Sequence, residues 1–325
     1  MRNLLTFALK VAISGILLYF AFAHVNFELI GRQLHHLQYF WLTTAILILI
    51  AQVGLIALRW QAIVEACNEP GAPPFTILKS LRYMFVAAFF NQTLPSSVGG
   101  DAVRIWMLAR DNGGWKSATY SVLIDRMVGV LVLALLVIAC LPWSFTLISN
   151  VAGRIALLLV GFGSIGACFT FLALGYVSWR WLDRWWLTRQ LAAAASTARR
   201  MFGAGSSRIS IVAYSVIIHL MTVTAAWWLA KAVAAPLEWS QALFLVLPVL
   251  LIATLPLSIA GWGTRETAMV LAFGYAGLAA TDGLVVSVLL GISTFAAGLP
   301  GGIIWILDHG KRRLAAERSQ PKSAP

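Results

Sequence analysis

Charged residues are scarce in this chain: only 11% of its 325 residues are charged, whereas 60% are hydrophobic. A soluble domain of this size does not need so apolar a composition to fill its core, so the composition indicates an integral membrane protein. The 24 Lys and Arg residues outnumber the 12 Asp and Glu residues. In a polytopic protein such an excess is first a signal of topology, and we expect no nucleic-acid partner.

Cysteine is also scarce. Cys67, Cys140 and Cys168 lie far apart, which excludes a disulfide framework and the ligand spacing of a metal site. The five histidines form no HExxH pattern, and the phosphate-loop pattern GxxxxGK[ST] does not occur. We therefore expect no cofactor, no bound metal and no step driven by nucleotide hydrolysis.

Long apolar segments, by contrast, are abundant. Those of about 20 residues can cross a bilayer, and six are predicted: 4–23, 40–60, 117–140, 151–177, 208–230 and 284–307. The first could instead be a cleaved signal peptide, because Arg2 and Lys10 accompany an apolar run that ends in Ala-Phe-Ala. A retained span fits a multi-span protein better.

Two further apolar segments, 76–110 and 241–275, break at related motifs. TLPSSVGGDAVR begins at Thr93 and TLPLSIAGWGTR begins at Thr254. When the two motifs are aligned without a gap, the initial Thr-Leu-Pro, one Ser, one Gly and the final Arg are identical. A broken helix at membrane depth must face protein or a water-filled cavity. Three predicted spans separate the two segments, so two hairpins would enter from opposite sides. Unless the motif recurs by chance, this pattern indicates an inverted-topology repeat around a shared site.

The basic residues orient this arrangement. With a cytoplasmic N-terminus most of them fall on the cytoplasmic side, as the positive-inside rule requires, and both termini are cytoplasmic. We expect a multi-pass protein of the inner membrane with one membrane domain, 1–310, made of halves at about 1–150 and 151–310, and a basic tail, 311–325. The Trp- and Arg-rich segment 178–202 is predicted to be an interfacial helix, either an anchor or a sensor of head groups.

Charged residues cluster at the first break. Asp101 and Arg104 follow Gly99 and Gly100 and share one helical face. They form either a helix cap with a local ion pair or, with the glycine amides, a corner that binds phosphate. Asp125 and Arg126 lie inside a span, where ionisable groups are costly unless paired, so we expect them to pair with the first motif. Arg59, at a span end, either snorkels to the interface or serves function.

The second break repeats the pattern, with Arg265 and Glu266 after Gly261 and Gly263. Adjacent helical residues point about 100° apart, so Glu266 is predicted to be a poor partner for Arg265. We predict that Arg265 lines the same cavity as Arg104. A GLPGG run at 298–302 is predicted to serve close helix packing or to kink the last span.

These motifs resemble a known family. NQTLPSSVGGDAVR at 91–104, the Asp125-Arg126-Met-Val-Gly129 segment, LPLSIAGWGTRE at 255–266 and LPGG at 299–302 are similar to the flippase-like family that shares the transmembrane region of lysylphosphatidylglycerol synthases. Members include the lipid-flipping half of multiple peptide resistance factors and stand-alone proteins of hopanoid, glycolipid or polyprenyl-lipid pathways. The synthases continue into a large soluble domain that these residues do not contain, so we expect no synthase activity.

The resemblance and the charges together predict a lipid translocator rather than an enzyme. Its substrate would be an amphipathic lipid, either anionic or of the polyprenyl or glycolipid type. The alternative is a membrane subunit or scaffold for a lipid-modifying enzyme, and a lipid-biosynthesis enzyme is a possible partner in either case. The predicted head-group site comprises Arg59, Asn91, Pro95, Gly99, Gly100, Asp101, Arg104, Asp125, Arg126, Pro256, Gly261, Gly263, Arg265 and Glu266.

Overall fold

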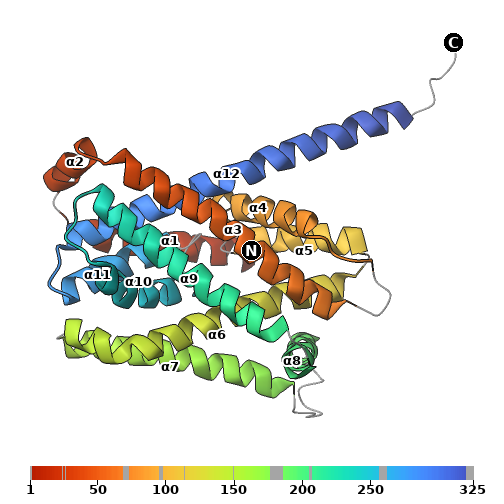
Figure 1. The fold of residues 1–325 in the computed structure, drawn as a ribbon, viewed down its shortest axis with the longest axis horizontal. Coiled ribbons are helices and arrows are strands. Elements are labelled where there is room, and N and C mark those ends of the chain that lie inside the picture. Colours follow the sequence, from red (N-terminus) through yellow and green to blue (C-terminus); the bar gives the residue numbers. More distant parts are fainter. Residues whose placement is uncertain are drawn as a thin grey trace.

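The structure, a computed structural model, describes residues 2–23, 25, 27–68, 73–94, 98–112, 114–148, 150–175, 186–204, 207–255 and 262–319. The regular elements in these ranges are twelve α-helices (Figure 1). They are α1 (Arg2–Ala23), α2 (Phe27–His35), α3 (Tyr39–Cys67), α4 (Ile77–Thr93), α5 (Gly99–Asn112), α6 (Trp115–Leu147), α7 (Val151–Leu174), α8 (Trp186–Ala204), α9 (Ser207–Ala232), α10 (Trp239–Ala253), α11 (Thr264–Tyr275) and α12 (Ala280–Ser319).

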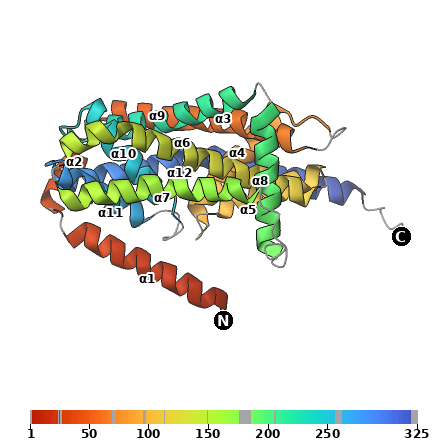
Figure 2. The same cartoon turned by 90° about the horizontal axis from the view of Figure 1, so that it is seen from below.

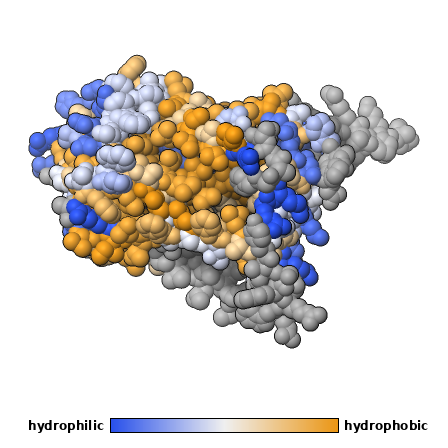
Figure 3. Space-filling model, turned by 60° about the horizontal axis from the view of Figure 1, so that its bottom comes forward, coloured by the Kyte–Doolittle hydropathy of each residue, from blue (hydrophilic) through white to orange (hydrophobic). Residues whose placement is uncertain are grey.

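Five of these helices are long and apolar enough to cross a membrane: α3, α6, α7, α9 and α12. The pair α1 and α2, bent by 86° between them, would make a sixth. Figure 3 shows an apolar belt between two hydrophilic ends, as a bilayer requires. The prediction of an all-α, multi-pass membrane protein is therefore confirmed.

The C-terminal part of the first helix packs against the bundle, whereas its N-terminal part stands away from the other helices (Figure 2). Ala21 packs with Val270 and Leu284, which lie on α11 and α12. In addition, the Thr267 hydroxyl donates a hydrogen bond of 2.8 Å to the carbonyl of Leu17. These contacts favour a retained first span over a signal peptide.

The two broken segments are helical hairpins, α4–α5 and α10–α11. The Ser80 hydroxyl near the start of α4 donates to the carbonyl of Ala57, in the C-terminal half of α3. Helix α9 lies antiparallel to α3, because the amide of Gln38, just before α3, donates to the carbonyl of Ala232 at the end of α9. Since α10 begins shortly after that end, the hairpins enter the bundle from opposite ends (Figure 1).

The repeat extends from the motif to four consecutive helices. The motifs are offset by 161 residues, and α4 and α10 begin 162 residues apart, at Ile77 and Trp239. The starts of α6 and α12, Trp115 and Ala280, are 165 residues apart. The four helices α3 to α6 thus correspond in order to the four helices α9 to α12. Because α3 and α9 are antiparallel, the two copies run in opposite directions through the bundle.

Three segments differ from the predictions in detail. Residues 27–35, which lie between the first two predicted spans, form the helix α2. The predicted interfacial helix at 178–202 corresponds to α8, which begins at Trp186, and 178–185 lie outside the described residues. Helix α8 runs across the direction of the other helices (Figure 2), as an interfacial helix does. Helix α12 continues to Ser319, beyond the expected domain end at 310.

The glycine-rich run in α12 serves close packing. A Cβ atom at Gly301 would overlap the carbonyl oxygen of Phe85, and one at Gly298 would lie 3.2 Å from backbone atoms of Ala88 and Phe89. Small residues in membrane helices permit such close approach of backbones. The run therefore seats α12 against α4, the first helix of the first hairpin.

Candidate functional site

The centre of the site is Asp125, which is buried on α6. Its Oδ1 accepts a hydrogen bond of 2.9 Å from Nε of Arg59, and its Oδ2 accepts one of 2.9 Å from Nη1 of Arg104. These partners come from α3 and α5, so one carboxylate joins three helices. Arg59 is only 7% exposed and also donates to the Ser215 hydroxyl on α9, which excludes a snorkelling role.

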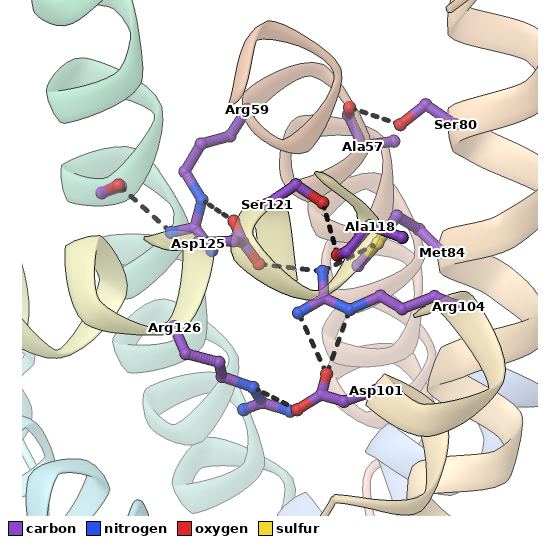
Figure 4. Close-up of polar contacts among 11 residues, drawn as sticks. Ala57, Arg59, Ser80, Met84, Asp101, Arg104, Ala118, Ser121, Asp125 and Arg126 are labelled. Atoms are coloured by element: carbon purple, nitrogen blue, oxygen red, sulfur yellow. Dashed lines mark hydrogen bonds and ion pairs between the residues drawn. The ribbon is translucent and has the colours of Figure 1, made fainter. Parts of the chain in front are cut away.

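A second carboxylate extends this network. Oδ1 of Asp101 accepts a hydrogen bond of 3.0 Å from Nε of Arg104, whose Nη2 lies 2.9 Å from the same oxygen in an ion pair. Oδ2 accepts a hydrogen bond of 2.8 Å from Nε of Arg126. The result is a continuous chain of alternating charge, Arg59–Asp125–Arg104–Asp101–Arg126, which we name the Arg–Asp chain (Figure 4). The prediction that Asp125 and Arg126 pair with residues of the first motif is thus confirmed.

The local backbone explains why Arg104 is held so firmly. A Cβ atom at Gly100 would overlap the carbonyl oxygen of Ala87, so only glycine lets α5 start this close to α4. The amide of Gly100 donates to Oδ1 of Asn91 at 2.9 Å, which makes Asn91 a positioning residue. Arg104 lies over the ring of Trp60, with 5.2 Å from Cζ to the ring centroid.

Of the two interpretations of the first motif, the geometry therefore favours an internal ion-pair network. The amide of Gly100 is occupied by Asn91, and Arg104 directs its Nε, Nη1 and Nη2 atoms at carboxylates of the protein. A phosphate corner would need these donors to be available. The burial of Arg104, which is 2% exposed, fits a structural member of the network.

The second motif holds its arginine differently. Arg265 donates to Oε1 of Glu266 from Nε at 3.1 Å and from Nη2 at 2.6 Å, so the prediction that Glu266 is a poor partner was wrong. The reason is the first helical turn: Glu266 bends back so that Oε2 accepts from the amide of Gly263 at 2.6 Å, and the long Arg265 side chain reaches its other oxygen. Gly263 has a φ of +96°, a conformation that favours glycine. Ser287 on α12 completes this cluster.

Two cavities adjoin these clusters. The central cavity, about 500 Å³, is lined by Arg126, Asp101 and Arg265 together with residues of both hairpins. The inner cavity, about 360 Å³, is lined by the Arg–Asp chain and His219. Both cavities share four lining residues, namely Asn91, Asp101, Arg126 and Thr254. Because Thr254 begins the second motif, the two motifs meet where the cavities adjoin.

Arg265 was predicted to share a cavity with Arg104. The structure places Arg265 with Arg126 on the central cavity, whereas Arg104 lines the inner one. Gly99 does not line either cavity, and a Cβ atom there would crowd Leu94. Of the other predicted site residues, Pro95, Pro256 and Gly261 lie outside the described residues.

Several polar residues of the site were not predicted. Gln52 on α3 donates to the Thr222 hydroxyl on α9, and both line the central cavity. His219 lies on the inner cavity with Nε2 3.0 Å from the carbonyl oxygen of Gly129, and Ser215 and Ser287 bind arginines. Ser215, His219 and Thr222 lie on the otherwise apolar α9 at a spacing that puts them on one helical face. Such a row of polar residues at membrane depth is the signal that could have identified them.

A family model described as the lysylphosphatidylglycerol synthase TM region matches residues 7–302. The match covers all four motifs on which the resemblance was based, and the resemblance is thereby confirmed. A comparison with curated proteins found no match.

Proposed function

The chain belongs to the lysylphosphatidylglycerol synthase transmembrane-region family, and from that premise we propose that it moves an amphipathic lipid between the two leaflets of the membrane. The family relates it to lipid modification and transport. The observation that carries the proposal is the central cavity, which lies between two hairpins entering from opposite ends and is lined by Asp101, Arg126 and Arg265. A volume of about 500 Å³ is in the range of small-molecule sites.

The cavity supplies what lipid translocation requires. A polar head group cannot cross hydrocarbon unaided, because each charge or unpaired polar group costs several kcal/mol there. Arg126 lies eleven residues beyond the start of α6, about 16 Å along the helix axis. That is roughly half the thickness of the hydrocarbon core. A head group in the central cavity would therefore be midway between the leaflets.

The pairing of the acids favours transport over catalysis. Both oxygens of Asp101 and both of Asp125 accept hydrogen bonds from arginines. A general acid or base must be able to exchange a proton with its substrate, and a carboxylate held between two guanidinium groups is poorly suited to that role. We therefore propose a translocator that is not itself an enzyme.

For orientation we propose the inner membrane with both termini cytoplasmic. Basic residues gather at the end of the bundle where α4 begins and α5 ends, namely Lys79, Arg82, Arg110 and Lys116. Helix α1 runs away from this end and α12 runs toward it (Figure 2). The positive-inside rule assigns such an end to the cytoplasm.

The experiment is a translocation assay in vesicles that contain the purified protein and a fluorescent lipid, with dithionite quenching the label in the outer leaflet. We expect faster exchange between leaflets than in protein-free vesicles. Thr254→Trp should reduce the exchange rate to that of protein-free vesicles. Thr254 lines both cavities, so the indole would fill the space where they adjoin. The matched control is Leu78→Trp, at a side chain that is 75% exposed on α4. Equal rates with and without protein, or undiminished rates in Thr254→Trp, would contradict the proposal.

A further inference from the structure

We infer that the site takes a head group with a single negative charge, and that Arg126 and Arg265 are the residues that bind it. This inference rests on the proposed function, because it names the chemical class of the lipid that occupies the central cavity. It follows from the balance of charge around the cavities and from the arginine nitrogen atoms that find no hydrogen-bond partner among the described residues.

The charges around the two cavities do not cancel. The Arg–Asp chain contains three arginines and two aspartates, which leaves one positive charge. The second cluster pairs Arg265 with Glu266 and is neutral. Among the described residues, no other Lys, Arg, Asp or Glu lines either cavity. His219, as a neutral imidazole, adds none.

An uncompensated charge at membrane depth is costly, and the cost falls when an opposite charge enters the same cavity. A head group with one negative charge would bring the sum to zero. A neutral or zwitterionic head group would leave the positive charge in place, and a head group with two negative charges would replace it by a negative one. The charge balance therefore favours a monoanion over both alternatives.

Not every arginine of the site has a hydrogen-bond donor available for such a ligand. Arg104 is 2% exposed and uses Nε, Nη1 and Nη2 for Asp101 and Asp125. Arg126 uses only Nε, for Asp101, and its side chain is 49% exposed. Nη1 and Nη2 of Arg126 make no hydrogen bond within the described part of the chain. Arg126 is thus the member of the Arg–Asp chain whose guanidinium remains available on the central cavity.

Arg265 provides a second donor on the same cavity. Its Nε and Nη2 bind Glu266 and Ser287, and no described residue accepts a hydrogen bond from Nη1. A phosphodiester and a carboxylate each present two oxygens that share one negative charge, and such groups form strong, charge-assisted hydrogen bonds with arginine. Arg126 and Arg265 come from opposite halves, so one anion could bind both halves at once.

The test compares labelled lipids of different head-group charge in the vesicle assay: phosphatidylcholine, which is zwitterionic, phosphatidylglycerol, with one negative charge, and phosphatidic acid, which approaches two. We expect phosphatidylglycerol to be moved fastest. Arg126→Gln should slow its transport roughly 10- to 100-fold, the effect of losing a charged hydrogen-bond partner. Because this change also removes the excess charge, it should shift the preference toward phosphatidylcholine. Arg126→Lys should retain the preference for the monoanion.

The matched control is Arg32→Gln, an arginine on α2 whose side chain is 75% exposed. It should leave both rate and preference unchanged. In parallel, the thermal stability of the protein in neutral detergent is titrated with phosphatidylglycerol and with oleate, since a ligand that binds the folded state stabilises it. Stabilisation by both ligands identifies any monoanion as the target, whereas stabilisation by phosphatidylglycerol alone identifies the phosphodiester.

The outcomes separate the two proposals. If phosphatidylcholine or phosphatidic acid moves as fast as phosphatidylglycerol, the inference fails while the proposed function stands. If no lipid moves faster than in protein-free vesicles, the proposed function fails and the titration decides the inference. In that case the inference is supported if a monoanion stabilises the protein and Arg126→Gln abolishes this stabilisation. It is overturned if no monoanion stabilises the protein or if the variant is stabilised equally.

Discussion

The most informative perturbation of the Arg–Asp chain is Asp125→Asn. Asp125 is 2% exposed and accepts one charge-assisted hydrogen bond from Arg59 and one from Arg104, each 2.9 Å long. Asparagine keeps the shape but has a single acceptor oxygen, so its amide group would face one guanidinium as donor against donor. The net charge of the Arg–Asp chain would also rise from +1 to +2.

The expected cost follows from these two bonds. Hydrogen bonds to charged groups contribute about 1.5–3 kcal/mol each, and removing one partner of a buried ion pair costs about 3–5 kcal/mol. We therefore expect Asp125→Asn to lower the free energy of unfolding by about 3–5 kcal/mol. In a thermal unfolding experiment in detergent, followed by the fluorescence of the 14 tryptophans, this corresponds to a decrease in Tm of roughly 4–7 °C.

A surface pair provides the control. Glu28 and Arg32 are 3.6 Å apart with both side chains largely exposed, and such pairs contribute about 0–1 kcal/mol. Glu28→Gln should therefore change the Tm little. In a double-mutant cycle, Arg59→Gln combined with Asp125→Asn restores the net charge of the Arg–Asp chain, and we expect a coupling of about 0.5–3 kcal/mol. If Asp125→Asn is as mild as Glu28→Gln, or if the two buried changes are additive, the network does not stabilise the fold as argued.

Two further predictions concern packing and topology. Gly301→Ala should cost about 1–3 kcal/mol or more, because the added methyl group would overlap the carbonyl of Phe85. Gly163→Ala, where nothing lies within 4 Å, should change stability by less than about 1 kcal/mol in the same thermal assay, and equal effects would disprove the packing argument. In a background without the native cysteines, Trp115→Cys and Ala279→Cys should react with a membrane-impermeant maleimide from opposite sides. Reaction of both from one side would rule out the opposed hairpins.

The breaks, their spacing and their opposite entry were predictable from the sequence for a physical reason. In hydrocarbon the backbone must satisfy its own hydrogen bonds, so apolar runs become helices whose ends can be located by counting residues. The shared Thr-Leu-Pro start of the motifs at Thr93 and Thr254 then fixed where two helices are interrupted. The same reasoning could not predict α2, because the short segment from Phe27 to His35 is polar on one side and apolar on the other, and hydropathy alone does not separate such a helix from a loop.

The partners of the arginines were harder to predict, and Arg265 illustrates why. The helical angle between Arg265 and Glu266 argued against a pair, yet a side chain at the start of a helix can turn back, and a guanidinium reaches several ångströms from its backbone. Arg59 posed the opposite problem. Its position at the end of an apolar run suggested an interfacial residue, but α3 continues to Cys67 and carries Arg59 into the protein interior.

The amino-acid sequence by itself determined that this chain is a membrane protein with two inverted, interrupted halves and with charges at both interruptions, because the bilayer imposes its constraint on each segment separately. Only the tertiary structure decided which charges neutralise one another. Arg59 and Asp125 are 66 residues apart, and their contact depends on how α3 packs against α6. That packing buries Arg104 between two carboxylates and leaves Arg126 on the central cavity, a distinction between two arginines that composition and spacing treat alike.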